Sequence, residues 1–145
     1  MPKHASVTEA HSQLAQGSVY VDVRSQAEFA QGHPAGAVNV PLIDRDPRSG
    51  QMMPNPDFMQ VMQANYPVDT KLLIGCQVGG RSMRAAQMLE AFGFSDVTNV
   101  KGGFSGMRDY TGRSVDPGWE EEGLPIETEA PAGQGYEDLV TKAGL

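Results

Sequence analysis

The segment CQVGGRS, residues 76–82, holds the single cysteine of this 145-residue chain, followed by two glycines and an arginine. Glycine allows the tight or left-handed backbone that turns several N–H groups towards one point, and such loops bind anions. A thiol at the start of a helix is stabilised as a thiolate, and Arg81 would add a positive charge. A thiolate is a nucleophile, so we predict that Cys76 is catalytic. An inert buried thiol is the common alternative for a free cysteine.

Composition narrows the chemistry that Cys76 can perform. A single cysteine allows neither an internal disulfide nor a clustered-cysteine zinc site. The spacing of His4, His11 and His33 does not suggest a metal site, so we expect no metal and no cofactor. With 18 acidic and 11 basic side chains the formal net charge is −7, which disfavours binding to nucleic acid.

The hydropathy pattern gives no sign of a membrane protein. No apolar run approaches the length that spans a bilayer, and residues 1–18 lack the features of a signal peptide. We therefore expect a cytoplasmic protein with no membrane partner.

Strand and helix patterns alternate along the chain and predict how Cys76 is positioned. Short apolar or β-branched runs predict strands at 19–23, 37–40, 71–74 and 97–100. Strands separated by helices favour an α/β fold with a mainly parallel sheet covered on both faces. Ligands of such sheets bind at the carboxyl ends of the strands, which is where Cys76 follows residues 71–74.

Helix boundaries are also marked in the sequence. Ser6 with Glu9 and Ser25 with Glu28 have capping-box spacing, which predicts two helix starts. Asn55 followed by Pro56 predicts a third, after a loop at residues 44–55. A fourth helix is predicted from Arg81 to Phe92, ending at Gly93, with an inward face made of four apolar residues, Ala85, Met88, Leu89 and Phe92.

The C-terminal residues have a weaker pattern. We predict a domain at 5–126 and a tail at 127–145. In the tail, Tyr136, Leu139 and Val140 have helical spacing, so a short amphipathic helix could dock on the domain or on a partner. A frayed terminus is the alternative.

Three motifs in this order resemble the rhodanese family. Residues 76–82 resemble its active-site loop, in which a cysteine opens the loop and glycine stands at the fourth position. VDVRSQAEFAQGHPAGAVNVP, residues 21–41, resembles a second family signature, and Gly102-Gly103-Phe104 resembles a third. The resemblance covers residues 5–126. It implies a rhodanese-like three-layer fold with a five-stranded, mainly parallel sheet flanked by helices.

The resemblance also implies an activity, single-domain thiosulfate sulfurtransferase. Cys76 would attack the outer sulfur of a donor such as thiosulfate and release sulfite. It would then hold a persulfide and pass the sulfur to a thiophilic acceptor, which could be a thiol, cyanide or a protein. The amides that would surround the sulfur belong to six loop residues, Gln77, Val78, Gly79, Gly80, Arg81 and Ser82.

Two further features are open to more than one interpretation. Asp22 and Arg24 resemble family positions and could act as acid and base, but a structural ion pair is the commoner role for such a pair. Residues 105–118 are longer than a minimal rhodanese domain needs. Arg108 and Arg113 could reach an anionic donor from there, or the segment is a solvated insertion.

Other activities fit the same residues less well. Protein tyrosine phosphatases place an arginine six positions after the cysteine, whereas position 82 here is serine and the arginine is at 81. The shorter loop favours a sulfur atom over a phosphate, so phosphatase or arsenate reductase activity is the weaker alternative. A persulfide carrier or protein-interaction module, with little turnover of small molecules, is the alternative from another class.

Overall fold

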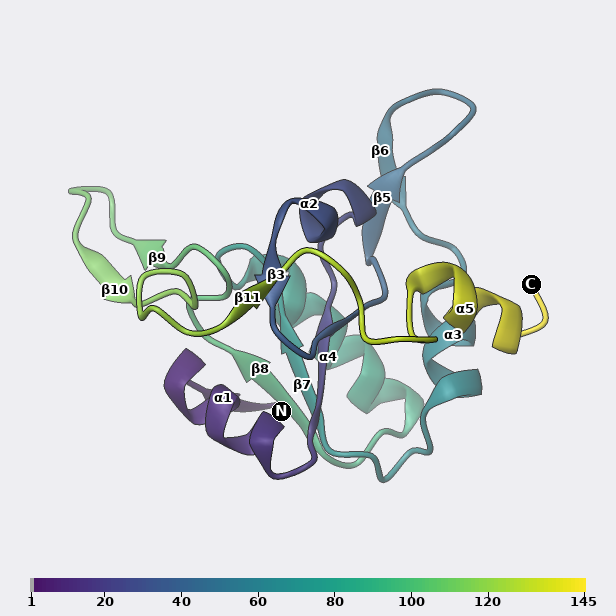
Figure 1. The fold of residues 1–145 in the computed structure, drawn as a ribbon, viewed down its shortest axis with the longest axis horizontal. Coiled ribbons are helices and arrows are strands. Elements are labelled where there is room, and N and C mark those ends of the chain that lie inside the picture. The colour runs from purple at the N-terminus through teal and green to yellow at the C-terminus, as the bar shows by residue number, and fades with distance from the viewer. Residues whose placement is uncertain (1) are drawn as a thin grey trace.

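The computed structural model describes residues 2–145, and a five-stranded sheet forms its centre (Figure 1). Every neighbouring pair of strands in this sheet is parallel. From one edge to the other the strands are β1 (Lys3–Ala5), β8 (Val97–Val100), β7 (Leu72–Gly75), β2 (Val19–Asp22) and β4 (Val38–Asn39). The predicted α/β class and five-stranded sheet are confirmed.

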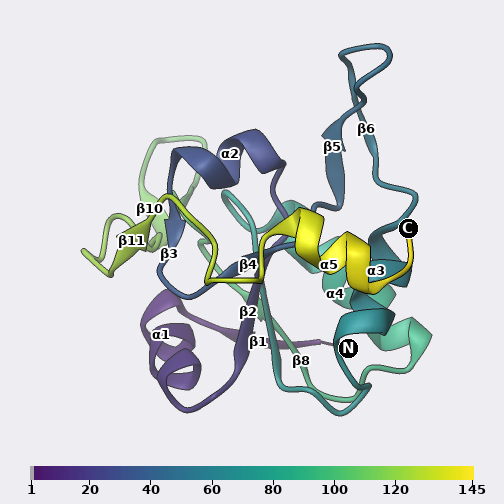
Figure 2. The same cartoon turned by 45° about the vertical axis from the view of Figure 1, so that its right-hand side comes forward.

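Helices cover both faces of the sheet (Figure 2). Alternate residues of one strand point to opposite faces. Tyr20 packs with α1 (Val7–Ala15), and Val21 packs with α3 (Phe58–Asn65) and α4 (Gly80–Phe92). α2 (Gln26–Gln31) adds Phe29 to the cluster on the α1 side, where Trp119 is fully buried. None of the helices in residues 2–145 is long and apolar enough to cross a membrane.

The helix boundaries follow the local signals. The side chain of Ser6 accepts the Glu9 N–H and Glu9 accepts the Ser6 N–H, and Ser25 and Glu28 form the same reciprocal pair. α4 ends at Gly93, whose φ of 124° is in the region that favours glycine. The two capping boxes and this terminator are confirmed.

Three small antiparallel sheets surround the main one. β5 (Ile43–Arg45) pairs with β6 (Met52–Pro54), and β9 (Met107–Arg108) pairs with β10 (Ser114–Asp116). β3 (His33–Pro34) pairs with β11 (Ile126–Glu127). The prediction of a loop at 44–55 was wrong, because residues 43–54 form the projecting β5–β6 hairpin, whose turn uses Gly50 with a φ of 72° (Figure 1).

Two other predictions about helices need correction. α3 begins at Phe58, because Asn55 accepts the Asp57 N–H and holds residues 55–57 in a turn. In α4 the inner face is Ala85, Ala86 and Leu89, whereas Met88 and Phe92 are 39% and 46% exposed. Small side chains face the sheet there, which lets the helix lie close to it.

Residues near the C-terminus pack on the main body. α5 (Tyr136–Lys142) lies beside α3, and Leu139 is 2% exposed within the core cluster that contains Val61 and Met62. Asn65 on α3 donates a hydrogen bond of 2.9 Å to the Leu139 carbonyl. The division between a domain at 5–126 and a tail at 127–145 stays a prediction.

This packing predicts that α5 contributes to stability. We expect Leu139→Ala to lower the free energy of unfolding by about 2–4 kcal/mol, because it removes a buried side chain and leaves a cavity. The exposed Lys142 is the matched control, and Lys142→Ala should change stability by less than about 0.5 kcal/mol. Urea unfolding measures both. Equal effects of the two substitutions would show that α5 does not dock in solution.

Candidate active site around Cys76

Cys76 lies between the carboxyl end of β7 and the start of α4 (Figure 1). The segment after β8 fixes the backbone of this loop. Phe104 N–H donates to the Cys76 carbonyl at 2.8 Å, and Ser105 N–H donates to the Gln77 carbonyl at 2.9 Å. Gly103 makes this approach possible, since its φ is 55° and a Cβ there would lie 2.3 Å from the Cys76 oxygen.

The thiol of Cys76 is 2% exposed and has hydrogen-bonding partners from the loop. Its Sγ accepts the Gly79 N–H at 3.1 Å and donates to Ser82 Oγ at 3.3 Å. Gly79 is the N-cap of α4, and its φ is 129°. The backbone N–H groups in the first turn of α4 have no hydrogen-bond acceptor within that helix. The free amides and the partial positive charge of the helix N-terminus therefore lie beside the sulfur.

Asn99, on the neighbouring strand β8, holds the Ser82 hydroxyl that contacts the thiol. Ser82 Oγ lies 2.6 Å from Asn99 Oδ1, and both side chains are almost fully buried. Our sequence prediction did not include Asn99. Its position at the carboxyl end of a strand next to the Cys76 strand was the signal that could have identified it.

Asp22 and Arg24 form a buried ion pair beneath the loop, with side chains 2% and 3% exposed. Arg24 Nε and Nη2 both donate to the Asp22 carboxylate, and Nη2 also donates to the Gly32 carbonyl at 2.7 Å. Nη1 donates to Gln77 Oε1 at 3.1 Å, and the guanidinium stacks 4.6 Å above the Phe104 ring. These contacts brace residues 77 and 104, as a structural ion pair would, and an acid–base role for the pair stays untested.

The described hydrogen bonds of the Arg81 side chain go to Glu28 and not to the thiol of Cys76. Its Nη1 and Nη2 bind the two oxygens of Glu28 on α2 at 2.8 and 3.0 Å. This fork lowers the pKa of Glu28 to about 2, because the hydrogen bonds from Arg81 outweigh the opposite effect of burial. Arg81 therefore ties α4 to α2 at the rim of the loop. Its predicted role in binding substrate stays a prediction.

The lowered pKa of Glu28 predicts a pH-dependent effect on stability. A carboxyl whose folded pKa lies below its ordinary 4.5 stabilises the fold above that pH, and this contribution disappears as pH falls through about 2. We expect Glu28→Gln to cost about 1 kcal/mol at pH 7, a small value because the pair is partly exposed. Glutamine keeps one oxygen that can accept the Ser25 N–H, so the substitution preserves the capping box while removing the charge and one acceptor of the Arg81 pair. Urea unfolding at pH 7 and pH 3 should show a smaller difference at pH 3, and a constant difference would contradict the assignment.

Two pockets lie on either side of the Cys76 loop. One, of about 350 Å³, is lined in part by Arg24, Glu28, Gln77, Phe104, Ser105 and Glu120. The other, of about 300 Å³, is lined in part by Val78, Gly79, Met83, Asn99, Lys101 and Met107. Arg108 on β9 binds Glu121 and lines neither pocket, and Arg113 also lines neither.

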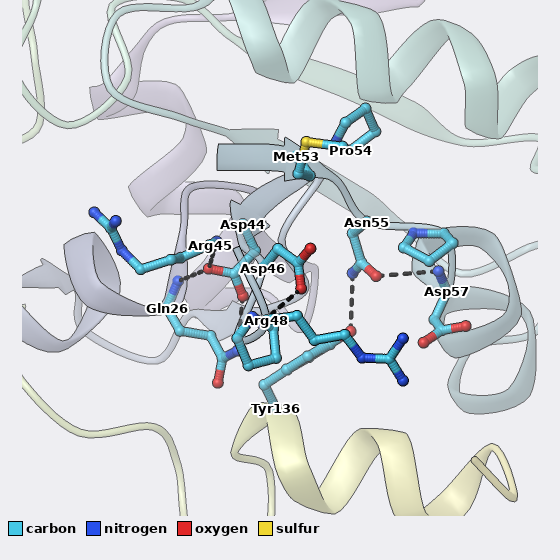
Figure 3. A pocket seen from close by; sticks show the side chains of 12 residues that line it. Gln26, Asp44, Arg45, Asp46, Arg48, Met53, Pro54, Asn55, Asp57 and Tyr136 are labelled. Atoms are coloured by element: carbon cyan, nitrogen blue, oxygen red, sulfur yellow. Dashed lines mark hydrogen bonds between the residues drawn. The ribbon is translucent and has the colours of Figure 1, made fainter. Parts of the chain in front are cut away.

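A larger cavity, of about 620 Å³, lies elsewhere, between the β5–β6 hairpin and α5 (Figure 3). Asp44 and Arg48 lie on its hairpin side, and Asn55 donates to the Tyr136 hydroxyl across it. None of its lining residues belongs to the loop at 76–82. Within residues 2–145 no group of three or more His, Cys, Asp or Glu side chains could hold a metal ion.

Comparisons with known proteins agree with this geometry. The family model described as Rhodanese-like domain matches residues 6–109. Thiosulfate sulfurtransferase 16, chloroplastic, of Arabidopsis thaliana is 38% identical over 125 residues, which are 86% of this chain and 92% of that protein. Thiosulfate sulfurtransferase GlpE of Pseudomonas fluorescens is 33% identical over 103 residues, 71% of this chain and 77% of that one. The crystal structure of Rv0390 from M. tuberculosis superposes with a TM-score of 0.70 at 27% identity, covering 88% of this chain and 98% of that one.

Proposed function

Because the chain belongs to the rhodanese-like domain family, we propose that it is a sulfurtransferase in which Cys76 carries the transferred sulfur as a persulfide. One observation carries the proposal. The Cys76 Sγ lies against the Gly79 N–H, at the N-terminus of α4, where a sulfur anion is stabilised.

The reaction has two displacement steps. The Cys76 thiolate attacks the outer sulfur of a sulfane donor and forms a new S–S bond. The donor's own S–S bond breaks, and the leaving group keeps its electron pair. With thiosulfate the leaving group is sulfite. In the second step an acceptor thiolate or cyanide attacks the outer sulfur of the persulfide and regenerates the Cys76 thiolate. Neither step needs an external oxidant or reductant.

The loop favours this chemistry over phosphate transfer. Ser82 occupies the place of the arginine that phosphatases use, and its hydroxyl binds Asn99 within the protein. The two arginines beside the loop, Arg81 and Arg24, are paired with Glu28 and Asp22. Both guanidinium groups would have to leave an acidic partner to clamp a phosphate above Sγ, which supports sulfur transfer over phosphate transfer.

Turnover of small molecules tests the proposal. Purified protein mixed with a sulfane donor and cyanide should release thiocyanate catalytically, whereas a phosphatase substrate should remain intact. Release of only one thiocyanate per chain, with no further turnover, would instead support a persulfide carrier that needs a protein partner. Absence of thiocyanate with every donor, including organic persulfides, would contradict both.

A further inference from the structure

The pocket beside the Cys76 loop has an unusual charge balance for a site that takes a small anion. Its Arg24 is neutralised by Asp22 in a buried pair, and the neighbouring Arg81 is neutralised by Glu28. Glu120 also lines the pocket, is exposed, and forms no ion pair within residues 2–145. The charged side chains that line the pocket are Arg24, Glu28 and Glu120, so the pocket carries a net negative charge.

The other cation near the loop does not reverse this balance. Lys101 lines the pocket on the opposite side of the loop, with Val78 and Met107. It lies close enough to α1 to lower the pKa of Glu9 slightly, in addition to the larger effect of hydrogen bonds from Ser6. Asp116 lines the same pocket and offsets its charge further.

The two parts of a sulfur donor meet different environments in this arrangement. The loop amide of Gly79 and the start of α4 attract the single sulfur atom that is transferred. The rest of the donor stays outside the loop. For thiosulfate that remainder is an anionic sulfonate. The pocket that reaches Gln77, the residue after Cys76, is lined by Glu28 and Glu120. An anion that enters this pocket meets like charge, which slows association, most strongly at low salt.

We propose that this site selects organic persulfides whose carrier group has no net negative charge, such as a persulfide on a neutral peptide, over the thiosulfate dianion. The inference rests on the proposed function and specifies its donor. The Cys76 thiolate attacks the outer sulfur of R–S–SH, the S–S bond of the donor breaks, and R–S⁻ leaves, so that Cys76–S–SH forms. The proton of the persulfide then equilibrates with solvent, and no redox partner is required.

A pair of donors that differ by one charge tests the selection without changing the leaving sulfur. The probes are the persulfide of N-acetylcysteine amide, whose carrier is neutral, and the persulfide of N-acetylcysteine, whose carrier has a carboxylate. Loading of Cys76 is followed by intact mass after quenching. At about 0.01 M ionic strength we expect the amide to load roughly two- to fivefold faster than the acid. The ratio should approach one at about 0.15 M, where the screening length falls to about 8 Å.

Glu120→Gln identifies the source of the effect. Its side chain makes no described hydrogen bond, so the substitution removes one charge and no described contact. We expect kcat/KM for thiosulfate to rise roughly two- to fivefold at low ionic strength, with a smaller change for the amide persulfide. Glu122→Gln is the matched control, because this exposed residue is close in sequence but does not line the pocket. It should leave both donors unaffected.

The outcomes separate this inference from the function on which it rests. If no donor loads Cys76, the proposed sulfurtransferase chemistry fails and donor selection fails with it. If the donors load Cys76 but the acid reacts as fast as the amide, or thiosulfate loading slows as salt is added, the selection is overturned while the function stands. Equal effects of Glu120→Gln and Glu122→Gln would also overturn it.

Discussion

Cys76→Ser should lower sulfur-transfer turnover by about a thousandfold or more, with every donor. A serine hydroxyl is not ionised near neutral pH, and it cannot form the S–S bond that carries the sulfur between donor and acceptor. The substitution is nearly isosteric, and the Gly79 N–H and Ser82 hydroxyl that contact Sγ can still contact the smaller oxygen. The expected loss is therefore chemical and not structural.

The control for this variant is its stability. Urea unfolding and circular dichroism of Cys76→Ser should match the parent protein to within about 1–2 kcal/mol, which separates loss of the nucleophile from loss of the fold. Thiocyanate release measures the activity. Retention of more than a small fraction of the turnover would show that another group carries the sulfur.

Arg24→Met should have the largest effect on stability, a loss of about 3–5 kcal/mol. It leaves the Asp22 carboxylate, which is 2% exposed, without its cation, and it removes the hydrogen bonds to Gln77 and Gly32. Because Gln77 follows Cys76 directly, we also expect turnover to fall in the fraction that remains folded. Urea unfolding gives the free energy, and the activity is measured well below the unfolding midpoint.

The matched control is a variant that removes both charges. Asp22→Asn with Arg24→Met should be less destabilised than Arg24→Met alone, because the penalty for one unpaired buried charge disappears. A double variant that loses the sum of the two single effects would show that the residues act independently, against the bracing role that their hydrogen bonds indicate.

Much of the fold could be predicted because its signals are local. A capping box needs only Ser25 and Glu28 three positions apart, and a helix terminator needs only Gly93 at the right place. The placement of Cys76 at the carboxyl end of a central strand also followed from short-range pattern and the rule for parallel sheets.

The features that escaped prediction depend on contacts between distant segments. β1 has the sequence Lys-His-Ala, which carries no strand signal, and it exists as a strand because it pairs with β8. Met88 and Leu89 follow Ala85 by three and four residues, so helical spacing predicts that both are buried. Only Leu89 is buried, because the position of α4 on the sheet decides which residues face inward.

The site likewise combines local features that could be predicted with distant contacts that could not. Residues 76–82 could be located from sequence, but the contact of Arg81 with Glu28 joins residues 53 positions apart. The contact of Ser82 with Asn99 likewise crosses from α4 to β8. Sequence spacing cannot reveal such pairings, because they join residues that lie far apart in the chain.

The mass of the Cys76 peptide after exposure to a sulfane donor tests the central claim most directly. The protein is incubated with thiosulfate or with the persulfide of N-acetylcysteine amide, alkylated, digested, and compared with the same sample treated with cyanide. We predict one added sulfur on the peptide that contains Cys76, removed by cyanide with the release of one thiocyanate per chain. A Cys76 peptide that gains no sulfur from either donor would contradict the account.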